Sequence, residues 1–152
     1  LVYYNNYKNR LHNVITKNHF LIRIQILTGI GLLIFWGLFF TIGLAPENPP
    51  KGFFEYEHSF PVPDLILALG LLYSAFLNKK DHAFGRDLTL VCGGAIIFLG
   101  VLDISFNSQN GMYALSTADL IGNLFINIWC LFVGGYSVLS ASGKLSEKLS
   151  FQ

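Results

Sequence analysis

The sequence is poor in charged residues, which make up 12% of its 152 residues against about 25% in an average soluble domain. It also lacks a P-loop, a Gly-x-Ser-x-Gly elbow, a His-Glu-x-x-His pair and a dinucleotide fingerprint. The low charge argues against an ordinary soluble domain, and no common catalytic motif is present. The sequence leaves enzyme activity open but favours a non-enzymatic protein without a cofactor.

Cysteine and histidine are also scarce. Cys92 and Cys130 lie in different apolar stretches and form no Cys-x-x-Cys pair, which argues against a thiol oxidoreductase. All four histidines lie outside the apolar stretches, so a buried haem would lack paired axial ligands. They are His12, His19, His58 and His82. The only methionine is Met112, so we expect further residues before Leu1.

Four long hydrophobic stretches make up most of the chain, which is 53% hydrophobic with a mean hydropathy of +0.51. They cover about residues 20–44, 62–77, 88–106 and 119–140. Backbone groups in lipid must bond within their own segment, so stretches of this kind form helices. The sequence predicts an all-α, polytopic bundle of four transmembrane helices, as a single membrane domain over residues 1–152.

The basic residues are distributed unevenly between the predicted connections, and this predicts the orientation. Nine of the ten Lys and Arg residues fall on one side of the spans, and only Lys51 falls on the other. We therefore expect a multi-pass protein of the plasma (inner) membrane with both termini cytoplasmic, including the tail 141–152. The loops after the first and third spans then face outward.

The N-terminal segment 1–19 has an amphipathic pattern. Apolar residues recur every three or four positions, and basic residues lie on the other faces. This pattern predicts an interfacial helix on the cytoplasmic membrane surface, where lipid headgroups and not nucleic acid are the expected partner. The alternative is a solvated basic tail.

Polar residues gather at the predicted outer ends of the spans. Asp103 and Asn107 lie near the end of the third span, and the fourth begins with an i, i+4 stripe of Asp119, Asn123 and Asn127. Asp64 opens the second span. In an antiparallel bundle these six residues converge on an outward-facing polar cleft, which either binds a ligand or is structural. The sequence does not indicate a metal for this cleft.

Four of these residues also have a structural interpretation. Asp64 follows Pro63 and fits a helix start, and Ser116 with Asp119 resembles a capping box. Asn123 and Asn127 fit interhelical hydrogen bonding. Asp103 is harder to explain this way, because a carboxylate near a helix C-terminus in an apolar span needs donors, a cation or a proton.

The first outer loop alternates aromatic and acidic residues over positions 53–60. This alternation predicts a short extended segment. It forms either a lid over the polar cluster or an interfacial aromatic belt. The candidate lid residues are Glu55, Tyr56, Glu57 and His58.

Three functions fit this pattern. The first is an accessory or binding subunit of a membrane complex, with partner subunits or a homo-oligomer and a lipid, small molecule or cation in the cleft. The second is an ion, proton or small-molecule transporter or channel protomer that acts as an oligomer. The third, an outer-leaflet enzyme, lacks an evident nucleophile or metal set and ranks last.

Overall fold

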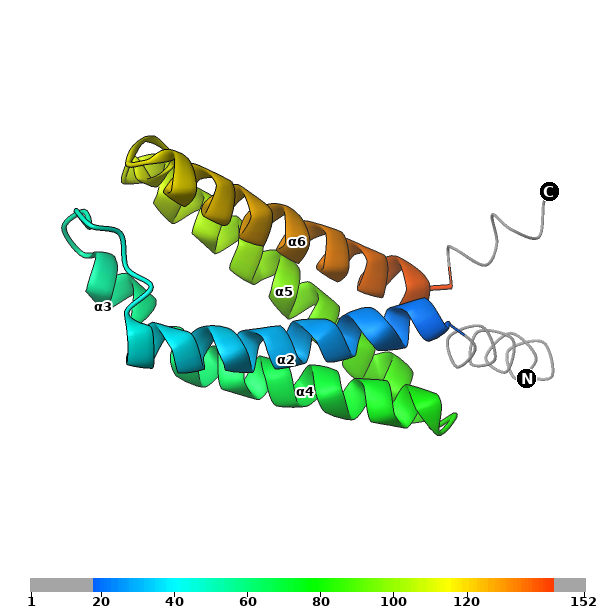
Figure 1. Ribbon diagram of the computed structural model, residues 1–152. Coiled ribbons are helices and arrows are strands. Elements are labelled where there is room, and N and C mark those ends of the chain that lie inside the picture. Colours follow the sequence, from blue (N-terminus) through cyan, green and yellow to red (C-terminus); the bar gives the residue numbers. More distant parts are fainter. Residues whose placement is uncertain (1–17, 144–152) are drawn as a thin grey trace.

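The computed structural model describes residues 18–143 and is shown in Figure 1. The predicted interfacial helix and most of the predicted tail lie outside the described residues. Within them every regular element is a helix, and no strand occurs. The elements are α2 (His19–Ile42), α3 (Phe53–Glu57), α4 (Pro61–Lys79), α5 (Ala83–Gln109), the 3-10 turn η1 (Met112–Ala114) and α6 (Thr117–Ala141).

Four of these helices are long and apolar enough to cross a membrane: α2, α5, α6 and the stretch Phe53–Lys79 that contains α4. The expectation of an all-helical chain with four such helices is confirmed. Several ends differ from the predicted spans, most clearly in α5, which begins five residues before position 88 and ends three residues after 106. Polar residues at both ends of α5 hid these turns from a hydropathy criterion.

Short-range side-chain bonds fix where the helices begin. The Asn18 side chain accepts a bond from the backbone N–H of Leu21 at the start of α2. At the start of α6, Ser116 Oγ accepts from the backbone N–H of Asp119 at 3.1 Å, as a capping box requires. Helix α4 begins with Pro61 and has no side-chain cap. Asp64 therefore lies in the first turn of α4 without capping it.

The helices form two antiparallel pairs, α2 with α4 and α5 with α6, and contacts between α4 and α5 join the two pairs (Figure 1). The start of α2, the α4–α5 turn and the end of α6 lie together at what we call the basic end. The opposite end carries α3 and η1, and we call it the acidic end. Among the described residues the basic end holds Arg23, Lys79, Lys80 and Arg86, and the acidic end holds six of the eight carboxylates.

The α5–α6 pair approaches closely because it meets through small residues. A Cβ added at Gly93 would lie 3.1 Å from the backbone oxygen of Gly134, and one at Gly134 would lie 2.8 Å from that of Gly93. Nothing lies within 4 Å of a Cβ added at Gly31, Gly94 or Gly135, so these three glycines make no such close contact.

The segment expected to be extended is instead the short helix α3. Gly52, with φ of +84°, turns the chain into it. Backbone N–H and C=O groups in this stretch form hydrogen bonds within α3 and at its C-cap. The Tyr56 ring turns inward and packs on Phe106 of α5. The expectation was wrong because period-two alternation over only eight residues cannot be told from a short helix that buries the Phe53 ring and half-buries that of Tyr56.

Candidate functional site

Asp64 on α4 is the most deeply buried carboxylate at the acidic end, with 4% of its surface exposed. The indole Nε1 of Trp36 on α2 donates to Asp64 Oδ2 at 2.9 Å. The second oxygen, Oδ1, is buried and has no hydrogen-bond partner. A buried carboxylate oxygen without a donor is costly, so this atom lacks a hydrogen bond that a ligand with a donor group would supply.

Asp103 on α5 is held in a similar way by an aromatic donor. The hydroxyl of Tyr56 donates to Asp103 Oδ1 at 3.2 Å. The Tyr56 ring stacks on Phe106 one turn further along α5, with centroids 3.8 Å apart and planes 3° apart. It also meets the Phe60 ring edge-on at 4.7 Å. Helix α3 is thereby held against α5 over the carboxylate.

The carboxylates of Glu57, Asp64 and Asp103 are near enough to act on one another electrostatically. We call these three residues the carboxylate cluster. Among the described residues no lysine or arginine forms an ion pair with them, and the only donors to them are the neutral groups of Trp36 and Tyr56. The cluster therefore brings three acidic groups together in a partly buried place without a counter-ion from this part of the chain.

The other predicted site residues lie apart from this cluster or are occupied locally. Asp119 accepts a bond from the Ser116 hydroxyl at the start of α6. Asn127 donates to the Tyr113 hydroxyl at 2.7 Å, and its Oδ1 has no partner. Asn107 is buried with an unpartnered Nδ2, and Asn123 is half-buried on α6. Of the predicted set, only Asp64 and Asp103 belong to the carboxylate cluster.

The four candidate lid residues divide in two. Tyr56 and Glu57 are half-buried beside Asp103, whereas Glu55 and His58 are exposed. The His58 ring stacks on Phe40 of α2, with centroids 6.0 Å apart and planes 6° apart. Helix α3 therefore contacts α5 through Tyr56, and His58, which directly follows α3, contacts α2.

A second polar group lies towards the basic end and was missed from the sequence. It consists of Gln25 on α2, Ser74 and Asn78 on α4, and Thr89 on α5, all at most 1% exposed. Thr89 Oγ1 accepts from Gln25 Nε2 at 3.1 Å and from Asn78 Nδ2 at 2.9 Å. It donates in turn to the Gly85 carbonyl at 2.8 Å. We call these four residues the amide–hydroxyl network.

The sequence does contain a signal for this network. Ser74 and Asn78 are four residues apart in one apolar helix, and Gly85 and Thr89 are four apart in the next. Such spacing places them on single helix faces. Gly85 is needed there because a Cβ at this position would lie 2.9 Å from the backbone nitrogen of Asn78. The network joins α2, α4 and α5 by hydrogen bonds and contains no charged residue.

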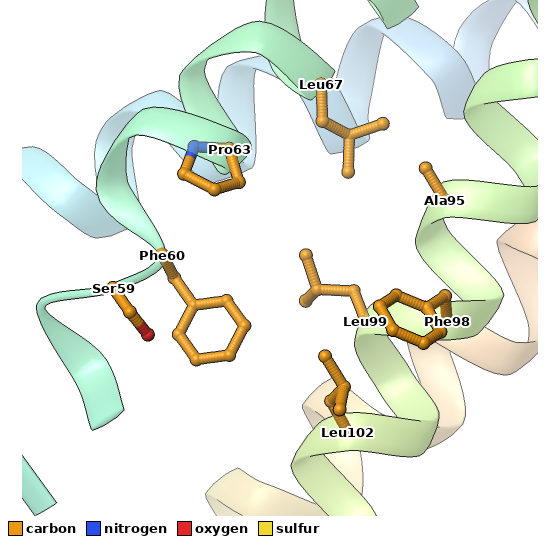
Figure 2. A pocket seen from close by; sticks show the side chains of 8 residues that line it. All are labelled: Ser59, Phe60, Pro63, Leu67, Ala95, Phe98, Leu99 and Leu102. Carbon is orange, nitrogen blue, oxygen red and sulfur yellow. The ribbon is translucent and has the colours of Figure 1, made fainter.

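An apolar groove of about 230 Å³ lies between α4 and α5 near the acidic end (Figure 2). Phe60, Pro63 and Leu67 line it from the α4 side, and Ala95, Leu99 and Leu102 line it from α5. Ser59 and Phe98 complete the lining. None of the six predicted site residues lines this groove, so it is separate from the expected polar cleft.

The described residues contain no group of three or more His, Cys, Asp or Glu side chains placed to hold a metal ion. Fold and polar residues together define a small all-helical bundle whose four long apolar helices fit a small integral membrane protein. No protein-family model, curated protein or solved structure compared with the chain matches it.

Proposed function

We propose that this chain is a non-enzymatic accessory or binding subunit of a membrane complex, and that the carboxylate cluster at its acidic end binds a small ligand with an ammonium group. The observation that carries the proposal is the unpartnered Oδ1 of Asp64. Partner subunits, or further copies of this chain, complete the assembly.

The chemistry of the cluster favours an ammonium group over a metal ion. Metal ions need several ligand atoms within about 2–2.6 Å, and the cluster carboxylates belong to no group of side chains placed to hold a metal. An ammonium group carries its charge on N–H donors, which can reach one oxygen of Asp64 while the others interact over a longer range. The hydrogen bond from Trp36 holds the Asp64 carboxylate in place, and the hydrogen bond from Tyr56 holds that of Asp103.

We rank this function above a transporter or channel. Between the carboxylate cluster and the amide–hydroxyl network lie buried apolar residues, among them Leu67, Leu71 and Ile96. The network itself is closed by its own hydrogen bonds and contains no ionisable group. A path for an ion through one protomer would have to cross this apolar layer.

The binding proposal is tested with Asp64→Asn in purified protein reconstituted in phosphatidylcholine nanodiscs. We expect the wild type to bind butylammonium, and the variant to bind it about 10–100-fold more weakly, because a hydrogen bond to a charged group contributes about 1.5–3 kcal/mol. Isothermal titration calorimetry measures both affinities. Tetramethylammonium has the same charge without an N–H donor, and we expect it to bind weakly to either protein.

The matched control is Asp119→Asn, which neutralises a carboxylate at the same end that lies at the start of α6 and outside the cluster. It should leave butylammonium affinity unchanged. Absence of butylammonium binding to the wild type, or equal losses in both variants, would contradict the proposal.

We also propose that the chain resides in the plasma (inner) membrane with the basic end in the cytoplasm. Lys79, Lys80 and Arg86 lie at or beside the α4–α5 turn, and Arg86 Nε donates to the Ala141 carbonyl at the end of α6. This grouping of basic residues at one end supports the orientation. In intact cells we expect Ser108→Cys to react with a membrane-impermeant maleimide, and Lys80→Cys to react only after the membrane is permeabilised. The reverse pattern would place the carboxylate cluster on the cytoplasmic side.

A further inference from the structure

The apolar groove and the carboxylate cluster share a wall. Phe60 lines the groove and its ring contacts Tyr56, whose hydroxyl donates to Asp103. Ser59, at the mouth of the groove, donates through its hydroxyl to the Tyr56 carbonyl. One short stretch at the end of α3 therefore bounds the groove on one side and the cluster on the other.

The same two helices supply both features at the same depth. On α4 the groove residues Pro63 and Leu67 flank Asp64 in the sequence, and on α5 Leu102 directly precedes Asp103. Each carboxylate thus lies on the helix face next to the one that lines the groove. The groove residues lie on both sides of the seam between α4 and α5 (Figure 2). A molecule with its polar head at the cluster would have its tail in this seam.

We propose that the ligand is an amphiphilic primary amine, with its alkyl chain in the groove and its ammonium group on Asp64 beside Asp103. This inference rests on the proposed function and adds the class of ligand. A groove of about 230 Å³ holds a chain of roughly eight water-sized groups at about 30 Å³ each. The charge complementarity comes from three carboxylates without a basic partner among the described residues.

The position of the groove also fits a ligand that arrives from the bilayer. Phe98 is 65% exposed, and Val62, next to the groove residues of α4, is 68% exposed. These side chains face lipid if the helices cross a membrane. An amphiphilic amine dissolved in the bilayer keeps its head near the interface, which is the depth of the cluster. Phospholipids fit less well, because their phosphate would lie beside Glu57, Asp64 and Asp103.

The test compares decylammonium with butylammonium, which has the same head and a short tail, in nanodiscs of phosphatidylcholine. Ala95→Phe fills the groove from an exposed position on α5, so it should not disturb the bundle. We expect it to weaken decylammonium binding about tenfold, as loss of contact with about two methylene groups would, and to leave butylammonium binding unchanged. The smaller variant Ala95→Leu should give the same effect at a reduced size.

The matched control is Ala118→Phe, the same substitution at an exposed alanine of α6 outside the groove. It should change neither affinity. If Ala95→Phe leaves decylammonium binding intact while Asp64→Asn removes both, the tail does not lie in the groove and only this inference fails. If Asp64→Asn leaves both amines bound, the proposed function fails as well.

Discussion

Gly134→Ala should lower the free energy of unfolding by about 1–3 kcal/mol, as overpacking of a tight contact usually does. The added Cβ would lie 2.6 Å from Ile97 Cγ1, 2.8 Å from the Gly93 oxygen and 3.0 Å from the Ile97 nitrogen. Two of these three atoms are backbone, so a side-chain rotation cannot relieve the contact. Helices α5 and α6, which share the most extensive contact of the described helix pairs, would have to separate.

The sign of this effect is informative because alanine normally favours a helix over glycine by about 0.5–1 kcal/mol. Gly135→Ala is the matched control, since nothing lies within 4 Å of a Cβ at that neighbouring position. We expect it to be neutral or stabilising. Denaturant unfolding of detergent-solubilised protein, followed by tryptophan fluorescence, measures both. Equal effects of the two substitutions would show that α5 and α6 do not meet at Gly134.

Thr89→Val should destabilise the bundle by about 1–2 kcal/mol, because it removes the hydroxyl at the centre of the amide–hydroxyl network with little change in volume. Gln25 and Asn78 would lose an acceptor, and the 2.8 Å bond between the Ser74 and Thr89 hydroxyls would be lost. Hydrogen bonds between membrane helices contribute about 0.6 kcal/mol each on average. Three such losses, with buried amides left short of partners, give the expected size.

Thr41→Val provides a control with the same chemistry. The Thr41 hydroxyl donates to the Gly37 carbonyl of its own helix at 2.7 Å, as Thr89 does to Gly85, but it is exposed and joins no other helix. We expect its effect to stay within about 0.5 kcal/mol. The same unfolding assay applies, and a Thr89→Val effect no larger than that of Thr41→Val would mean that the network does not bind α2, α4 and α5 together.

The four long helices could be predicted from the sequence because a run of apolar residues is a property of the local chain. Their ends were less well predicted. Helix α4 extends to Lys79, two residues beyond position 77, and the prediction stopped short because the last turn contains the polar residue Asn78. Asn78 has the polarity of a loop residue, yet it is 1% exposed and bonded inside the bundle. Hydropathy cannot distinguish a polar residue in a loop from one whose partners lie on other helices.

The sequence predicted at which end of the bundle the site residues lie, but not which side chains they bond. The sequence placed Asp64 and Asp103 near one end, and it indicated that Asp103 needs donors, a cation or a proton. That Trp36 bonds Asp64 depends on how α2 is rotated against α4. The i, i+4 stripe on α6 gave no information on which way it faces, and the structure shows Asn127 bonded to Tyr113 and not to Asp103. Rotation of each helix about its axis is set by packing, which no single span encodes.

The amide–hydroxyl network has a consequence for how the protein is made. Gln25 lies in the first long helix, whereas its acceptor Thr89 lies 64 residues later in the chain. A helix that enters the bilayer during synthesis therefore carries a bare amide until α4 follows with Ser74 and Asn78, and it lacks its bond to Thr89 until α5 follows. The first helix gains a complete set of partners only when α5 has emerged from the ribosome. A ribosome-stalled chain that ends before Thr89 should accordingly depend on insertion chaperones that shield polar side chains, and a chain that extends past it should not.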